Sequence, residues 1–201
     1  MDDEETAGVA FGKLASEFIR TKVAPEIDAF RFATYAGKSG ISKVGTGAAL
    51  TSGADVLSAL ITAQNTMDEN EVDINNRYLF ITPTLYNLMF NVDTTKSKAV
   101  LDSFAGISKV PQSRFYTAID LKDGTSSGEE AGGFAKSSGA ADINFMIIEK
   151  SALLQYPKHI VNKVISPEEN QTADAWKFFY RSYGLADVYE NKVNGIYLHH
   201  K

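Results

Sequence analysis

The chain has 201 residues, of which 44% are hydrophobic and 22% charged, with a formal net charge of -5 and no cysteine. These values are those of a globular protein, and they exclude wholesale disorder, a disulfide framework, a thiolate metal site and cysteine catalysis. The sequence has no block of lysines or arginines, so it does not suggest a surface that binds duplex nucleic acid. It also has no run that approaches the ~20 apolar residues of a membrane span.

Residues 5–36 are predicted to form one long amphipathic helix. Their apolar residues follow the three-and-four spacing that places one stripe on one face; the stripe includes Leu14, Phe18, Ile19, Val23, Ile27 and Phe30. At roughly 1.5 Å per residue the helix would run about 45 Å, longer than a compact domain of this mass needs. Pro25 is expected to kink or restart it, as the first residue of a second segment.

The middle of the chain alternates helix and strand signals after a glycine- and serine-rich connector at 37–53. Ser52 and Asp55 have capping-box spacing, which predicts a helix to about Thr66 with Val56, Leu57, Leu60 and Ile61 on its apolar face. Residues 78–81 are predicted to be a buried strand, and Thr82 and Pro83 to open a short helix through Met89.

The second half of the chain is predicted to consist mainly of strands. Strands are expected at 106–110 and 114–119, and a long loop at 122–141, which holds five glycines and four serines. Residues 143–148 are apolar on both faces except for Asn144, so this strand is expected to be central in its sheet. Residues 160–165 and the aromatic stretch 174–189 are also predicted strands. Asn194-Gly195 is typical of a hairpin turn, which would return residues 196–198 antiparallel beside the aromatic strand.

One segment matches a catalytic motif. Residues 124–128 follow the G-x-S-x-G pattern of a nucleophile elbow, and Glu149 and His159 follow Ser126 in the chain order of a hydrolase triad. The residues after Gly128 are glycine-broken instead of helix-forming, so a solvated loop is the favoured interpretation. With three histidines at unhelpful spacing, no metal site, cofactor or catalytic residue is predicted.

Four segments, taken in order, resemble the major capsid proteins of tailed bacteriophages, the Hong Kong 97-type coat fold. They are residues 23–37, 72–89, 142–167 and 174–199. The resemblance implies an α+β protein with a long spine helix, a peripheral domain with β-structure, and an axial domain with mixed sheet and helices. It implies the spine helix and a linker at 1–53, a mainly axial domain at 54–165, and peripheral β-structure at 166–201 that returns to the spine helix.

The resemblance also implies function. Such a protein is a structural component of a phage or prophage virion, made in the bacterial cytoplasm and self-assembling into the pentamers and hexamers of an icosahedral shell around the genome. Scaffold and portal proteins are the implied partners, with only weak, nonspecific contact with packaged DNA and no membrane contact. Family members carry an N-terminal arm and an extended loop before the spine helix. Here the predicted helix begins at residue 5, so a truncated fragment or prophage copy is expected.

Two alternatives stay open: an encapsulin-like cellular nanocompartment shell, and a serine hydrolase that uses Ser126, Glu149 and His159. Subunit-interface candidates are charged residues on the polar side of the first helix and in the glycine-rich loop, where a solvated charge is the commoner case. They are Arg20, Glu26, Asp28, Arg31, Glu129, Glu130 and Lys136.

Overall fold

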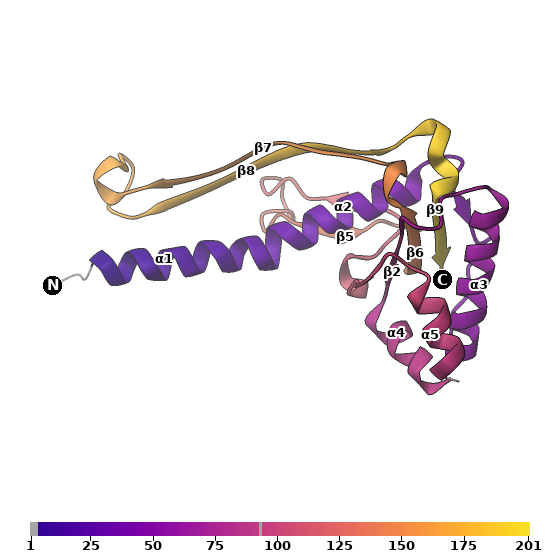
Figure 1. Cartoon of the computed structure of the whole chain (residues 1–201). Helices are drawn as coiled ribbons and strands as arrows, with labels where there is room; N and C mark the ends of the chain where they lie inside the picture. Colours follow the sequence, from indigo (N-terminus) through magenta and orange to yellow (C-terminus); the bar gives the residue numbers. More distant parts are fainter. Residues whose placement is uncertain (1–3, 93) are drawn as a thin grey trace. The chain divides into compact units, whose positions relative to one another are not determined.

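The structure, a computed structural model, describes residues 4–92 and 94–201, and its fold is α+β (Figure 1). The chain divides into two compact units. The smaller combines Met1–Ala24 with Gln155–Ala186, and the larger combines Pro25–Leu154 with Asp187–Lys201. Each unit is therefore built from segments that are distant in sequence.

A five-stranded mixed sheet forms the centre of the larger unit. Its strand order is β1-β9-β6-β2-β3, with β6 antiparallel to both β2 and β9, and with the outer pairs parallel. The strands are β1 (Ser42–Lys43), β2 (Arg77–Ile81), β3 (Gly106–Lys109), β6 (Ile143–Glu149) and β9 (Ile196–His200). Every residue of β6 is buried, which confirms the prediction of a central strand at 143–148.

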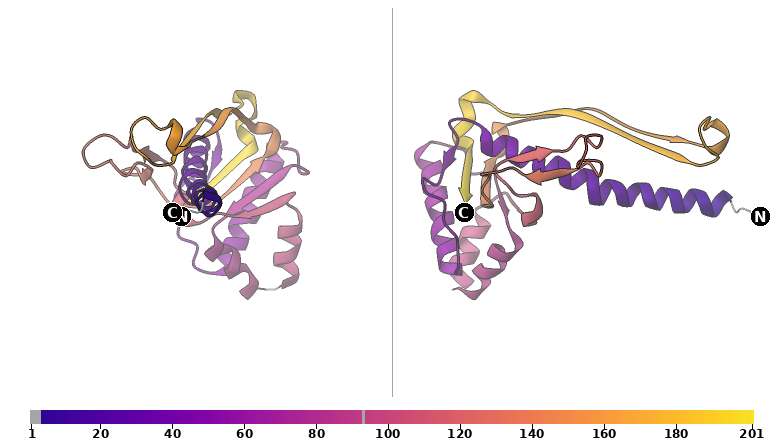
Figure 2. Two further views of the ribbon diagram at one scale, coloured as in Figure 1. Left: turned by 90° about the vertical axis from the view of Figure 1, so that its left-hand side faces the viewer. Right: turned by 180° about the vertical axis from the view of Figure 1, so that it is seen from behind.

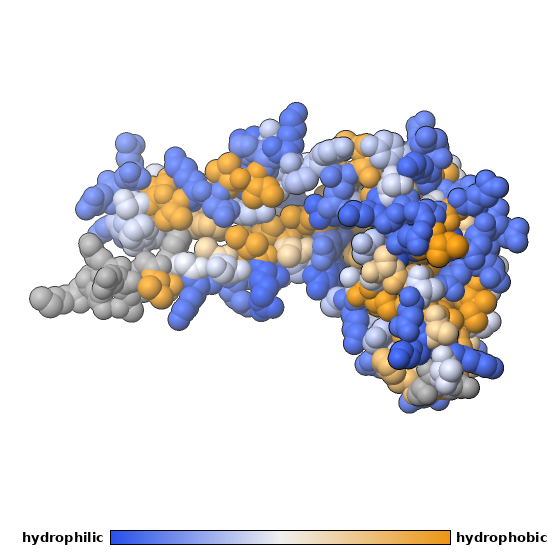
Figure 3. All heavy atoms as spheres, in the orientation of Figure 1, coloured by the Kyte–Doolittle hydropathy of each residue, from blue (hydrophilic) through white to orange (hydrophobic). Residues whose placement is uncertain are grey.

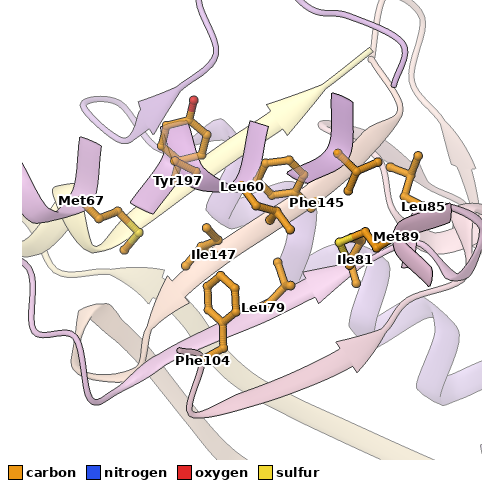
Figure 4. Packing of buried hydrophobic residues seen from close by; sticks show 12 residues of the cluster. Leu60, Met67, Leu79, Ile81, Leu85, Met89, Phe104, Phe145, Ile147 and Tyr197 are labelled. Atoms are coloured by element: carbon orange, nitrogen blue, oxygen red, sulfur yellow. The ribbon is translucent and has the colours of Figure 1, made fainter. Parts of the chain in front are cut away.

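The larger unit has four helices among the described residues: α2 (Ala24–Gly37), α3 (Gly53–Glu69), α4 (Pro83–Leu88) and α5 (Thr94–Asp102), with a 3-10 turn at Met89–Asn91. Helices α3 and α4 contribute to the main cluster on one face of the sheet, whereas Phe32 of α2 packs edge-on against Phe80, with centroids 5.3 Å apart, on the opposite face. Leu60 and Met67 of α3 pack with Ile81 of β2, Phe145 of β6 and side chains of α4 in one cluster (Figure 4). Burial of this contiguous apolar surface is the main stabilising contribution to the fold.

The start of α3 confirms the predicted capping box. The Ser52 hydroxyl accepts from the Asp55 amide at 3.2 Å, and the Asp55 carboxylate accepts from the Ser52 amide at 2.9 Å. Two of the orphan amides of the first turn are thereby satisfied. The inward face was predicted less well, since Ile61 is 41% exposed while Ala63 is buried.

The glycine-rich segment at 122–141 is not one long loop. It contains β5 (Phe134–Lys136), which pairs antiparallel with β4 (Ile119–Leu121), so the loop itself ends before Phe134. The predicted strand at 114–119 is also wrong: a 3-10 turn occupies Gln112–Arg114, and Tyr116 makes one isolated bridge to Asp142.

The smaller unit consists of helical residues and a two-stranded sheet. Its helix α1 (Glu4–Phe18) continues into a π-helical turn (Ile19–Val23), and the sheet pairs β7 (Leu153–Ile165) with β8 (Lys177–Val188). The two strands run side by side in the right-hand view of Figure 2 and in Figure 1. We call residues 155–165 and 177–186 the ribbon. It confirms that the aromatic stretch is a strand.

Residues 4–37 are helical throughout, which confirms the predicted long helix, and the helix does restart near Pro25. The π turn ends at Val23, where the amide of Ala24 donates to the carbonyl of Ile19, five residues earlier. Pro25, which has no amide to donate, then lies in the first turn of α2. Because a π turn holds an extra residue, it changes which side chains share a face. The predicted stripe is not a buried face on either side of the π turn: Leu14 and Phe18 in α1 are 65% and 46% exposed, and in α2 Ala29, Phe32 and Tyr35 are buried while Phe30 is 43% exposed.

The expected hairpin at the C-terminus is wrong. Residues Glu190–Gly195 form two short 3-10 turns that meet at the non-helical Lys192, and β9 pairs with β6 and β1 in the large sheet while β8 pairs with β7. The two observed units also have other bounds than the three expected segments. Which residues form peripheral and axial domains of a shell subunit stays a prediction.

Candidate assembly surface

The ribbon exposes large apolar side chains along its whole length. These side chains are 43–61% exposed: Tyr156, Ile160, Val161, Val164, Phe179, Tyr183 and Leu185. Figure 3 shows apolar and polar residues interleaved over the part formed by α1 and the ribbon. Scattered apolar residues are ordinary on a surface, but a contiguous set typically marks an interaction site.

Alternation along the strands divides these residues between two faces. The ring of His159 stacks on Tyr183 with centroids 5.3 Å apart, so odd-numbered residues of both strands share a face. This Tyr183 face consists of His159, Val161, Lys163, Lys177, Phe179, Arg181, Tyr183 and Leu185. On the other face, Phe178 packs edge-on against Phe18, with centroids 6.5 Å apart. The Tyr183 face is thus the one turned away from the helix.

Gly184 allows the two strands to approach closely. A Cβ atom at this position would lie 2.6 Å from the carbonyl oxygen of Tyr156 and 3.2 Å from the Cα of Pro157. Only glycine fits such an approach without a backbone shift. The residue therefore keeps the apolar side chains of the two strands in one surface.

The strands of the ribbon carry positive charge without negative charge. Lys158, Lys163, Lys177 and Arg181 lie on them, whereas the nearby acids Glu168, Glu169 and Asp174 lie in the connecting segment 166–176. Arg181 also stands over the Tyr183 ring, 5.8 Å from its centroid. The surface is suited to a partner that is apolar and negatively charged.

An isolated two-stranded sheet is marginally stable in water, and stability comes from packing against something else. The described residues of the smaller unit contribute no buried hydrophobic side chain; the buried ones all belong to the larger unit. A partner that covers the ribbon would therefore bury apolar area that this chain leaves in water, at about 25 cal/mol per Å².

The predicted interface residues of the first helix are already engaged within the chain. Arg20 pairs with Glu17 one turn away on the exposed face of the helix. Asp28 pairs with Arg114 at 3.1 Å. Burial nevertheless raises the pKa of the Asp28 carboxyl above its usual range, against the opposing charges of Arg114 and Arg31. Glu26 and Arg31 are half-buried in α2.

The predicted interface residues of the glycine-rich segment form local contacts as well. Glu129 accepts from the Asp123 amide at 3.2 Å, and Glu130 accepts from the Gly128 amide at 3.0 Å. Lys136 pairs with Asp142 at 2.8 Å. None of these contacts tests a subunit interface, so all seven residues stay candidates.

The prediction missed the apolar residues of the ribbon as the strongest candidate surface. A usable signal was present, because β7 and β8 carry apolar residues at both odd and even positions. Such a pattern usually indicates a strand buried on both faces. In the two-stranded sheet of β7 and β8, the same pattern places apolar side chains on both faces, where they are exposed to solvent.

The hydrolase alternative finds no support in the site geometry. The Ser126 hydroxyl donates to the Asp123 carboxylate at 2.5 Å, and Glu149 accepts from the amide and hydroxyl of Ser151. His159 stacks on Tyr183. Each member of the hypothetical triad therefore contacts a residue outside the triad.

The larger unit contains one buried polar pair beside a hollow of about 290 Å³, which Asp55, Ser58, Thr62 and His199 help to line. Asn144 donates to the Ala48 carbonyl at 2.8 Å and lies 3.0 Å from Nδ1 of His199. Burial lowers the pKa of the His199 imidazole, and its ring stacks on Phe145.

Within the described residues, no group of three histidine, aspartate or glutamate side chains is placed to hold a metal ion. No described helix is long and apolar enough to span a lipid bilayer.

The fold resembles that of solved phage and virus-like-particle structures. The structure of a virus-like particle from Pyrococcus furiosus superposes on 88% of this chain and 63% of its own, at 11% identity and a TM-score of 0.58. A Mycobacterium phage Che8 structure covers 88% of this chain and 58% of its own, at 10% identity and a TM-score of 0.55.

The capsid structure of cyanophage P-SCSP1u covers all of this chain and 66% of its own, at 15% identity and a TM-score of 0.55. The chain thus spans about three fifths to two thirds of the structures it resembles. No protein-family model matches it, and no curated protein matches it in sequence. The likeness lies in the fold, and it confirms the expected phage-capsid fold.

Proposed function

We propose that the chain is a structural subunit of a tailed-phage or prophage capsid, without enzymatic activity, that assembles with copies of itself into pentamers, hexamers and a closed shell around the genome. The observation that carries this proposal is the likeness to a phage capsid structure over the whole chain. The exposed ribbon supports it, because a shell subunit needs surfaces that stay uncovered until neighbours arrive.

In the proposed shell, α1 and the ribbon contribute to a peripheral domain, and the middle of the chain contributes to an axial domain. Scaffold and portal proteins are proposed partners on the same grounds, and packaged DNA would make only weak, nonspecific contact. The protein would be made in the cytoplasm of a bacterial host and end in the virion.

Electron microscopy tests the proposal. The chain is expressed in a bacterial host, together with any coding sequence that naturally precedes or follows it, and the purified material is imaged. Closed shells of uniform diameter are expected. Material that stays monomeric across the accessible concentration range would contradict the proposal.

A second candidate is a cellular compartment shell, favoured by the likeness to a virus-like particle from Pyrococcus furiosus. The contents of purified shells distinguish the two functions. A phage capsid would enclose phage DNA or be empty before packaging, whereas a compartment would enclose a defined protein. Nuclease-protected DNA and mass spectrometry of the lumen give the answer.

A further inference from the structure

The charge on the Tyr183 face limits how two copies could meet there. Lys163, Lys177 and Arg181 lie on this face, and the ribbon carries no acidic residue; Asp187, the next odd-numbered residue of β8, pairs with Lys38. Two such faces packed against each other would bring like charges together while removing them from water, which is costly. A contact between copies must therefore join this face to a different, acidic surface.

The loop after α3 offers such a surface. Glu69, Glu71 and Asp73 are exposed on it, and beside them Ile74 is 58% exposed. The amide of Glu71 donates to the carbonyl of Asp68 at 2.9 Å, but among the described residues the carboxylates of Glu69 and Glu71 have no hydrogen-bond or ion-pair partner. The loop thus combines an apolar side chain with unpaired negative charge, the complement of the Tyr183 face.

This loop is also held in place from beneath. Arg77 is only 3% exposed, and its guanidinium pairs with Asp68 at 2.7 Å and donates to the carbonyls of Val72 and Asp73. Asp73 in turn accepts from the amide of Asn75 at 3.0 Å. A loop that is ordered before binding loses little conformational entropy on binding, which favours affinity.

Another acidic segment, in the β4–β5 hairpin, is less suited. Asp123 accepts from the amides of Thr125 and Ser126, and Asp120 accepts from the Ser137 hydroxyl. Glu129 and Glu130 accept from backbone amides. A partner would have to compete with bonds that these carboxylates already make.

We infer that the Tyr183 face of one copy docks on the Glu69–Ile74 loop of a second copy, with Lys163 and Arg181 facing Glu69 and Glu71 and with Leu185 and Tyr183 covering Ile74. The contact rests on the proposed self-assembly and specifies its partner surfaces. Since the two surfaces differ, the contact is heterologous, and repetition produces rings or an extended lattice in place of a two-fold dimer.

Cross-linking tests the contact directly, because the chain has no cysteine of its own. Leu185→Cys and Ile74→Cys variants of the full chain are prepared separately, mixed, and treated with a short bifunctional thiol reagent. A cross-link between the two variants is expected, and peptide mass spectrometry identifies it. The matched control replaces Ile74→Cys by Ile61→Cys, also on an exposed apolar residue, and should give at least ten-fold less product.

A charge swap provides the second readout. Lys163→Glu/Arg181→Glu and Glu69→Lys/Glu71→Lys variants should each lose assembly, measured by sedimentation velocity, and the chain that carries all four substitutions should regain it. Lys96→Glu/Lys98→Glu and Glu168→Lys/Glu169→Lys are the controls, with equal charge changes on exposed residues elsewhere, and should assemble normally.

The outcomes distinguish a failure of the docking contact from a failure of the proposed capsid function. Shells that form without the 74–185 cross-link, or a swap that fails to restore assembly, would overturn the docking contact and leave the capsid function standing. Leu185→Cys cross-linked to itself would show face-to-face packing and also overturn it. Retention of single-stranded DNA that is lost in Lys163→Glu/Arg181→Glu, with no cross-link, would assign the face to nucleic acid instead. A chain that never associates would overturn both proposals.

Discussion

Arg77 and Arg20 each form an ion pair with a nearby carboxylate, but in opposite surroundings. Arg77 is buried and holds two backbone carbonyls in addition to Asp68, whereas Arg20 and Glu17 are exposed on α1. Arg77→Met should destabilise the protein by about 1–3 kcal/mol, because the carbonyls of Val72 and Asp73 lose a buried donor. Urea unfolding followed by circular dichroism measures the change.

Arg20→Met serves as the matched control for Arg77→Met. It removes the same side chain from an exposed pair and should leave the unfolding midpoint unchanged within error. Equal losses in the two variants would show that charge removal, and not the buried hydrogen bonds, accounts for the effect.

Asp28 and Asp142 should respond to pH with opposite signs. Burial raises the pKa of Asp28, so its charged form costs stability at neutral pH, and the cost disappears as the pH falls through the raised pKa. The hydrogen bond from Lys136 lowers the pKa of Asp142, so its contribution is present above the ordinary aspartate pKa and is lost as the pH falls.

Unfolding midpoints of Asp28→Asn and Asp142→Asn, measured against the unsubstituted chain from about pH 7 to pH 3, test this opposition. As the pH falls, Asp28→Asn should lose stability relative to the unsubstituted chain, and Asp142→Asn should gain. Parallel trends would contradict the assigned environments.

At the scale of elements, the sequence predicted those features that depend on interactions between residues close together in the chain. The capping box of Ser52 and Asp55 marks the start of α3 because both of its hydrogen bonds lie within one turn. The partner of β9 could not be found this way. The Asn194-Gly195 pair suggests a hairpin, but pairing with β6 buries Ile196 and Leu198 in the large sheet, and this gain involves residues about fifty positions away.

The ribbon illustrates the same limit for the candidate surface. Its apolar residues are visible in the sequence, but whether a strand is covered on both faces depends on which elements pack against it. The charged interface candidates were chosen for polarity, and the structure places several of them, such as Asp28 and Lys136, in pairs within the chain.

The first turn of α3 packs so closely on the end of α4 that only glycine fits. A Cβ atom at Gly53 would lie 2.3 Å from the carbonyl oxygen of Leu88 and 2.4 Å from Cγ2 of Val92. Gly53→Ala should therefore cost about 1–3 kcal/mol through overpacking, measured by thermal unfolding.

Gly12→Ala is the comparison within another helix. Nothing lies within 4 Å of a Cβ atom there, so the substitution should raise helix content in far-ultraviolet circular dichroism, in line with the gain of about 0.5–1 kcal/mol expected for alanine over glycine. A loss in both variants would indicate a general intolerance of alanine.

At the scale of the whole molecule, stability and assembly are assigned to different parts of the chain. The hydrophobic cluster lies entirely within the larger unit, and the exposed ribbon lies within the smaller one. The chain leaves the larger unit after Leu154 and returns at Asp187, and there the Tyr189 amide donates to the Ala152 carbonyl at 3.0 Å. The exit and the return of the chain are therefore adjacent.

Replacing residues 155–186 by a short glycine-serine linker should accordingly leave the larger unit folded. Thermal unfolding should stay cooperative, because the cluster around Leu60, Ile81 and Phe145 is intact, whereas shells should vanish from electron micrographs because the ribbon is gone. Shortening the loop at 123–132 instead removes a similar kind of exposed segment and should leave folding intact. If the variant without the ribbon still formed shells, the assembly surface would have to lie on the larger unit; if it failed to fold, the ribbon would be part of the folding unit and the division of roles would be wrong.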